Sequence, residues 1–214
     1  MAVCSETKKT CWPLLRQYGD EKTCLVPNVL DFMTQPFCRL ANNRGASPQD
    51  KLDRLAKYVV QSKAGKLFDR SKRGVWCANH GKQCHRRLAL DLVGGGSECT
   101  DFSVVGKKKG TDGSSFPATL AMVAQLAEAR EGLHENVSAF PINIVEDTLA
   151  RTHRVYCLPV TPGDHGFKQI VKRPRVYRLT VANRAKMAPT PNKILFHKCC
   201  VVALTSVLFD SDSE

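Results

Sequence analysis

Residues 88–96, LALDLVGGG, and residues 132–137, GLHENV, decide the fold of this chain. The apolar run at 88–93 ends in three glycines and is typical of a buried strand, and the second run has the length of another. Residues 118–130 between them have helical periodicity. Strand, helix and strand in this order predict two adjacent parallel strands joined by a crossover. Loops at the carboxyl ends of such strands carry function, and both GGGSEC and ENV fall there.

The flanking segments extend the same alternating pattern. Ser47 is a helix cap, and the apolar residues after it lie on one helical face, which predicts a helix over residues 48–63. A second helix is predicted over residues 142–150, and two β-rich runs, 153–160 and 175–181, form a hairpin-like pair. Together these elements predict an α/β fold that contains half of a doubly wound, Rossmann-like sheet.

Three regions are expected along the 214 residues. Residues 1–87 form a divergent, partly helical N-terminal segment, because prolines interrupt its short apolar runs and one amphipathic helix emerges. Residues 88–181 hold the alternating elements. Residues 182–214 form a C-terminal segment with an acidic tail, and its apolar stretch near 199–209 is too short to cross a bilayer. We therefore expect no membrane association.

The charge and the cysteines restrict the class of protein. The chain has 32 Lys and Arg against 20 Asp and Glu, and its net charge of +12 favours a polyanionic partner. No signal-peptide core follows Met1, so the 10 cysteines indicate reduced thiols rather than a disulfide framework. We expect an intracellular protein, and a nuclear one if its source is a eukaryote.

The segment GVWCANHGKQCH offers four potential metal ligands, which are Cys77, His80, Cys84 and His85. Zinc accepts these atom types. Their spacing matches no common zinc finger, however, and the adjacency of Cys84 and His85 strains tetrahedral closure by a single loop. We therefore assign no metal ligand and interpret the segment as a loop whose Trp76 and Cys77 pack against the protein.

The run DLVGGGSECTDFSVVGKKKG (91–110) resembles the catalytic loop of the C-5 cytosine DNA methyltransferases. That loop contains an Asp, a Gly-Gly pair, a nucleophilic Cys, Phe-Ser, and then Gly with a basic run, and this sequence supplies each of them in register. A match to the family's Glu-Asn-Val begins at Glu135, and the family's Arg-any-Arg pair corresponds to Arg173 and Arg175. The three blocks lie within residues 88–181, so the predicted sheet resembles part of an S-adenosylmethionine-dependent methyltransferase fold.

The resemblance implies a role for each matched residue. Cys99 is the nucleophile that adds to carbon 6 of cytosine, after which carbon 5 takes a methyl group from S-adenosyl-L-methionine. Glu135 hydrogen-bonds the ring nitrogen and the exocyclic amine, and Arg175 holds the ring oxygen and Glu135. Roles in binding substrate, DNA or the loop itself are implied for the other matched polar residues, which are Ser103, Lys107, Asn136 and Arg173.

DNA is the implied partner. The thiol attacks from above the plane of the base, which stacking blocks in a duplex, so the family flips the base out of the helix. A basic surface that grips the DNA backbone is part of that step, and the net charge agrees with it.

The chain departs from the family pattern near the nucleophile and in its first half. Glu98 replaces the family's Pro, and we expect a carboxylate beside Cys99 to disfavour the thiolate. Thr100 and Val171 replace two glutamines. Residues 1–87 show no strand followed by the glycine-rich turn that holds the cofactor. We therefore leave the cofactor-binding residues unassigned, and expect the chain alone to bind S-adenosylmethionine weakly or not at all and a partner chain to supply the missing half.

Two other functions are consistent with the sequence. A catalytically degenerate nucleic-acid-binding protein that keeps the methyltransferase scaffold is favoured by Glu98 and by the missing cofactor loop. The intact Cys99, Glu135 and Arg175 favour the enzyme. A zinc-dependent interaction module built on residues 77–85 is the third hypothesis.

Overall fold

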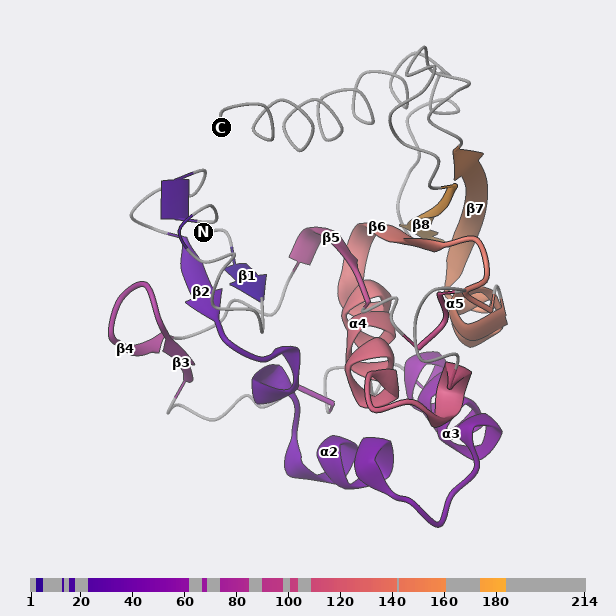
Figure 1. The fold of residues 1–214 in the computed structure, drawn as a ribbon, viewed down its shortest axis with the longest axis horizontal. Coiled ribbons are helices and arrows are strands. Elements are labelled where there is room, and N and C mark those ends of the chain that lie inside the picture. The colour runs from indigo at the N-terminus through magenta and orange to yellow at the C-terminus, as the bar shows by residue number, and fades with distance from the viewer. Residues whose placement is uncertain are drawn as a thin grey trace. The chain divides into compact units, whose positions relative to one another are not determined.

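A four-stranded mixed sheet carries the strand ends that were predicted to be functional (Figure 1). Its strands run in the order β5 (Leu90–Gly96), β6 (Ala129–Val137), β8 (Arg175–Ala182) and β7 (His153–Val160). The structure is a computed structural model, and all described residues lie in one compact unit, Met1–Asn183. The described residues are 3–5, 13, 16–17, 23–61, 67–68, 74–84, 90–97, 101–103, 109–141, 143–160 and 174–183.

Strands β5 and β6 are parallel neighbours, which confirms the central prediction. Leu90 pairs with Ala129 and Gly96 with Glu135, so the two strands end at the same edge of the sheet. β5 extends beyond the predicted end at Val93, because the three glycines continue the ladder with β6. β8 is antiparallel to both β6 and β7, which confirms the hairpin-like pair. The fold is therefore α/β, with antiparallel strands beside a parallel pair.

The crossover between β5 and β6 is made by helix α4 (Phe116–Glu128), which is apolar on nearly all sides. A helix of this kind has to be buried, and α4 packs against both strands and against helices on its other side. The predicted end at residue 130 was two residues too late, because Ala129 already pairs with Leu90 in the sheet. The buried residues of α4 are Phe116, Thr119, Leu120, Ala121, Met122, Val123, Ala124 and Leu126.

Helices α3 (Pro48–Val60) and α5 (Asn143–Leu149) confirm that the two other predicted helices exist, and they pack against each other. The predicted end of the first at residue 63 was three residues too late, because Gln61 caps α3. α3 begins with a complete capping box. Ser47 Oγ accepts a hydrogen bond from the Asp50 N–H at 3.1 Å, and the Asp50 carboxylate accepts one from the Ser47 N–H at 3.2 Å. These two bonds satisfy backbone donors of the first turn, which fixes where the helix starts.

The N-terminal part of the chain contains short strands that the sequence pattern missed. β1 (Val3–Ser5) and β2 (Cys24–Val26) form a parallel pair, and β3 (Val75–Cys77) and β4 (Lys82–Cys84) form an antiparallel hairpin. Strands of three residues are too short to show an alternating pattern. The description of residues 1–87 as a segment with one amphipathic helix was therefore incomplete.

One apolar core joins the N-terminal elements to the sheet. The 3-10 helix η2 (Val29–Phe32) and helix α2 (Gln35–Asn42) place Phe32, Phe37 and Ala41 in the same buried cluster as the side chains of α4. Burial of this shared apolar surface is the main favourable term that holds these elements together.

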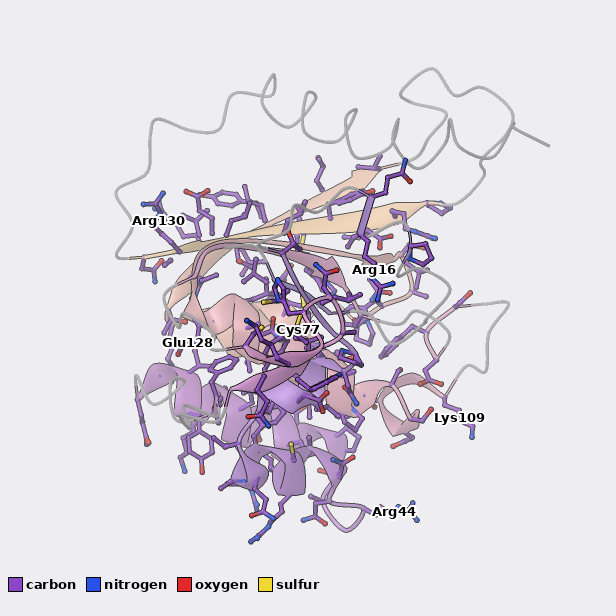
Figure 2. All side chains as sticks on the ribbon, turned by 90° about the vertical axis from the view of Figure 1, so that its left-hand side faces the viewer. Arg16, Arg44, Cys77, Lys109, Glu128 and Arg130 are labelled. Carbon is purple, nitrogen blue, oxygen red and sulfur yellow. The ribbon has the colours of Figure 1, made fainter. Side chains whose placement is uncertain are left out.

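Basic side chains lie at the periphery of the described structure. Arg44, Lys109 and Arg130 are exposed and extend outward in Figure 2, whereas Cys77 lies in the interior. In the part of the chain that the structure describes, no helix has both the length and the apolar character needed to cross a membrane.

Candidate active site at the strand ends

The candidate site lies where the end of β5, the end of β6 and the start of β8 meet. Gly96 is the register partner of Glu135 in β6, and Val137 is the partner of Arg175 in β8. A Cβ atom at position 96 would lie 2.7 Å from the Glu135 carbonyl oxygen and 3.0 Å from its Oε2. Glycine at position 96 therefore lets the loop after β5 begin directly against Glu135.

Glu135 and Arg175 form an ion pair at this edge. Arg175 Nε lies 2.6 Å from Glu135 Oε1, and 26% of the Arg175 side chain and 37% of the Glu135 side chain are exposed. Burial raises the pKa of the Glu135 carboxyl above its ordinary value, and the charge and hydrogen bond of Arg175 counteract part of that effect. The pair thus presents a half-buried carboxyl group with an increased affinity for a proton.

Asn136 holds the first residue of the loop that follows β5. Its Nδ2 donates hydrogen bonds to the Ser97 carbonyl oxygen at 3.1 Å and to Ser97 Oγ at 2.9 Å. Its Oδ1 accepts from the Val137 N–H at 2.8 Å. Asn136 is buried and Ser97 is half-buried, so these bonds are partly shielded from water. Asn136 thus ties the end of β6 to the residue that follows β5.

A buried histidine, His134, contacts Ser97, the same residue that Asn136 holds. His134 Nε2 lies 3.3 Å from Ser97 Oγ, and the His134 ring packs against Phe140 with centroids 5.1 Å apart. Burial, with a smaller contribution from Arg178, lowers the pKa of His134 to about 4. The imidazole is therefore neutral at physiological pH and acts as a fixed hydrogen-bonding group. His134 directly precedes the matched Glu-Asn-Val, but no motif pointed to it and it was not predicted.

The far side of the loop is anchored by Asp101, a second residue that the sequence analysis missed. Its carboxylate, which is buried, accepts hydrogen bonds from the Ser115 N–H at 3.0 Å and from Ser115 Oγ at 2.5 Å. Its carbonyl oxygen accepts from the Gly110 N–H at 2.8 Å. Ser115 precedes α4, so the carboxylate also lies at the positive end of that helix. A Cβ at Gly113 would collide with the same carboxylate.

Replacement of Asp101 by alanine is expected to lower the free energy of unfolding by about 2–4 kcal/mol, because it leaves the buried Ser115 donors without their acceptor. Urea denaturation measures this change. Asp53→Ala is the matched control, since Asp53 is exposed and its carboxylate accepts an exposed bond from Gln49 Nε2 at 2.8 Å. A change below about 0.5 kcal/mol in the Asp101 variant would contradict the anchoring role.

The remaining predicted site residues divide into two groups. Ser103 is half-buried and follows Phe102, whose ring packs against Phe140 with centroids 4.7 Å apart. The other three, Cys99, Lys107 and Arg173, lie outside the described residues. The structure thus brings the Glu135 and Arg175 side chains into contact, joins Asn136 to Ser97, and fixes the chain on both sides of Cys99, at Ser97 and Asp101.

No protein-family model matches the chain, and no curated protein matches its sequence.

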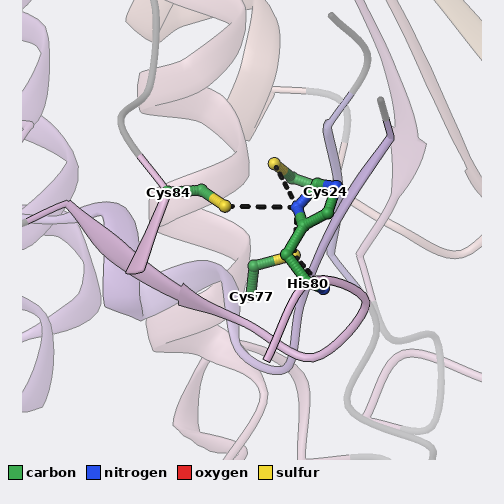
Figure 3. Close-up of side chains that lie close together, drawn as sticks. All are labelled: Cys24, Cys77, His80 and Cys84. Carbon is green, nitrogen blue, oxygen red and sulfur yellow. Dashed lines mark hydrogen bonds between the residues drawn. The ribbon is translucent and has the colours of Figure 1, made fainter. Parts of the chain in front are cut away.

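The cysteine and histidine residues near β3 and β4 form a cluster that differs from the sequence interpretation. Cys77, His80 and Cys84 lie together with Cys24, and their ligand atoms are all within 4.8 Å of one another (Figure 3). Cys24 is distant in sequence and was missed, and His85 lies outside the described residues. Trp76 does not pack against the protein as predicted, because 53% of it is exposed, whereas Cys77 is fully buried.

Proposed function

We propose that the chain is a DNA cytosine-5 methyltransferase-like protein that uses S-adenosyl-L-methionine as its methyl donor and has the corresponding methyltransferase fold. The observation that carries this proposal is the 2.6 Å ion pair between Glu135 and Arg175, placed beside Gly96 at the common end of β5 and β6. These residues come from separate matched segments of the sequence. A site that binds a single base requires the Glu135 and Arg175 side chains to lie at the same place, and their contact meets this requirement.

The proposed reaction begins with the thiolate of Cys99. It adds to carbon 6 of cytosine, and the electron pair of the 5,6 double bond becomes available at carbon 5. S-adenosylmethionine, when bound, would supply the methyl group that carbon 5 takes, with S-adenosylhomocysteine as the other product. Loss of the proton from carbon 5 to a base and expulsion of the thiolate restore the aromatic ring. Cys99 is two residues from Ser97, which is held by a partly buried hydrogen bond, and two from Asp101, which is held by a buried one.

Glu135 and Arg175 supply the polar recognition in this mechanism. A protonated Glu135 carboxyl donates to the ring nitrogen of cytosine and withdraws electrons from carbon 6, which promotes the attack of the thiolate. The pKa of Glu135, raised by burial, supports this role because it favours the protonated form. The guanidinium of Arg175 holds the carboxyl group in place and offers further donors to the ring oxygen.

DNA and a second polypeptide are the proposed partners. The net charge of +12 supports binding of a phosphate backbone. The described part of residues 1–87 holds a short parallel pair, and β2 is followed by Pro27 and Asn28 instead of glycines. Glycine-rich turns let the backbone approach such a ligand, and weak cofactor binding by the chain alone is part of the proposal. A partner chain that completes the cofactor site is therefore part of the proposal.

The proposal is tested with an oligonucleotide that contains 5-fluorocytosine. Fluorine at carbon 5 cannot leave as a proton does, so the thioether to the protein persists after methyl transfer. At millimolar S-adenosylmethionine, chosen to offset the missing contacts, mass spectrometry is expected to find the adduct on the peptide that contains Cys99. An adduct on another cysteine, or methylation of normal DNA without any adduct, would disprove the assignment.

A further inference from the structure

We infer that Cys24, Cys77, His80 and Cys84 bind one zinc ion in a closed, tetrahedral, structural site that joins β2 to the β3–β4 hairpin. This site is independent of the proposed methyltransferase chemistry. Three of its ligands come from a segment of eight residues, and the fourth comes from a strand 53 residues earlier.

The separation of the ligand atoms fits a single zinc ion. His80 Nδ1 lies 3.2 Å from Cys77 Sγ, 3.2 Å from Cys84 Sγ and 3.6 Å from Cys24 Sγ (Figure 3). Zinc bound at about 2.3 Å from sulfur and about 2.0 Å from nitrogen with tetrahedral angles separates these atoms by about 3.6 Å. One imidazole nitrogen thus faces three thiols at nearly the spacing that the metal imposes.

The donor set also has the chemistry of a structural zinc site. Three cysteines and one histidine form a common closed combination, and four protein ligands leave no open position for a substrate. Cys24 and Cys77 are buried, while His80 and Cys84 are half-buried. Cys24, Cys77 and Cys84 form no disulfide. The cluster therefore offers three thiols and a histidine nitrogen for one cation.

Backbone hydrogen bonds preorganise the ligands before a metal binds. Cys77 Sγ accepts from the Leu25 N–H at 3.3 Å and from the His80 N–H at 3.4 Å. Donors of this kind stabilise a thiolate. Gly81, with φ of 62°, makes the turn that returns the chain toward Cys84. The turn thus brings Cys77 of β3 and Cys84 of β4 to the same cluster.

Contacts between β2 and the hairpin complete the frame of the site. The Ala78 N–H donates to the Leu25 carbonyl oxygen at 2.8 Å, and Asn79 Nδ2 donates to the Thr23 carbonyl oxygen at 3.0 Å. These bonds bring the residues on either side of Cys24 against the turn after Cys77. Each strand here has three residues, and such short pairings are marginal without further support. A bound zinc ion supplies that support.

The first measurement uses the unaltered full chain, purified under reducing conditions from zinc-supplemented cells without a chelator. Elemental analysis is expected to give about one zinc ion per chain. Exchange for cobalt(II) is expected to give the intense visible bands of a tetrahedral ion and an ultraviolet thiolate-to-cobalt band. A chain that carries no stoichiometric zinc, or a cobalt spectrum without the thiolate band, would overturn the inference.

The second measurement locates the metal. The substitutions Cys24→Ser and Cys84→Ser are expected to lower the zinc content at least about tenfold, whereas His80→Cys retains it because four ligands remain. Cys38→Ser is the matched control, since Cys38 is a half-buried thiol outside the cluster whose Sγ donates to the Leu30 carbonyl oxygen. Zinc retained equally by both serine variants would place the ion elsewhere and overturn the inference.

A third measurement on the unaltered chain covers the case in which the serine variants do not fold. Alkylation followed by peptide mass spectrometry is expected to show Cys24, Cys77 and Cys84 protected, and to show that protection lost when a chelator removes the zinc. Equal labelling with and without chelator, or a disulfide among the three cysteines, would also overturn the inference.

Discussion

Replacement of Cys99 by alanine is expected to abolish exchange of the hydrogen on carbon 5 of cytosine, lowering its rate at least about 10³-fold. Addition of the thiolate at carbon 6 makes carbon 5 basic. In heavy water carbon 5 takes a deuteron, loses its original proton and expels the thiolate, which leaves a labelled base. The reaction consumes no S-adenosylmethionine, so it tests the nucleophile even when the cofactor site is incomplete.

The exchange is measured by mass spectrometry of a single-stranded oligonucleotide, which removes the cost of flipping the base out of a duplex. Cys157→Ala is the matched control, because Cys157 is an exposed cysteine on β7 whose Sγ donates to Glu146 Oε1 at 2.6 Å. Exchange by the Cys99 variant at the rate of the unaltered chain would remove Cys99 as nucleophile. A chain that binds the oligonucleotide without catalysing exchange would support the degenerate nucleic-acid-binding alternative.

Replacement of Glu135 by glutamine is expected to lower the exchange rate by about 10²–10⁴-fold, because glutamine cannot transfer a proton to the ring nitrogen. Glu131→Gln is the matched control. Glu131 lies four residues earlier on β6, its side chain is 49% exposed, and its ion pair with Arg130 is long at 3.8 Å. A decrease of the exchange rate by the same factor in both variants would show that the rate depends on the charge of β6 in general. That outcome would contradict a specific role of Glu135.

The pH dependence tests the protonation state of Glu135. Burial raises the pKa of this carboxyl, so its protonated form persists above the ordinary range and the rate falls as the pH rises through that pKa. The Cys99 thiolate forms as the pH rises, so the two requirements give a bell-shaped profile. Arg175 lowers the pKa of Glu135, and Arg175→Ala is therefore expected to move the descending limb to higher pH. A shift of the descending limb toward lower pH would contradict its assignment to the deprotonation of Glu135.

Local patterns in the sequence were sufficient for the main elements of the sheet. The alternation of apolar runs with helical segments predicted β5, α4 and β6 and the parallel pairing of the two strands. Ser47 and Asp50 fixed the start of α3, because a capping box depends on residues three positions apart. The order of the matched segments also indicated that Glu135 and Arg175 share a site, and their side chains are in contact.

Other features depended on contacts that local patterns do not contain. The end of α4 was misplaced because pairing with Leu90 takes Ala129 into the sheet. The anchoring role of Asp101 requires the start of α4 to lie beside the loop after β5, and no spacing in the sequence encodes that position. The short strands β1 to β4 form because each pairs with a partner strand. A strand of three residues is too short for an alternating apolar pattern to predict it from the sequence.

The sequence by itself determined the α/β pattern, the basic character of the chain and the matched residues Cys99, Glu135 and Arg175, because periodicity, charge and motif spacing are properties of neighbouring residues. Only the tertiary structure decided which side chains meet. It joined Asn136 to Ser97 across two strands, and it brought Cys24 to Cys77, His80 and Cys84. The physical reason is that a metal ligand set or a buried hydrogen bond is defined by distances in space. Contacts between β2 and the β3–β4 hairpin place the ligand atoms of Cys24 and Cys77, which are 53 positions apart, within 4.8 Å of each other.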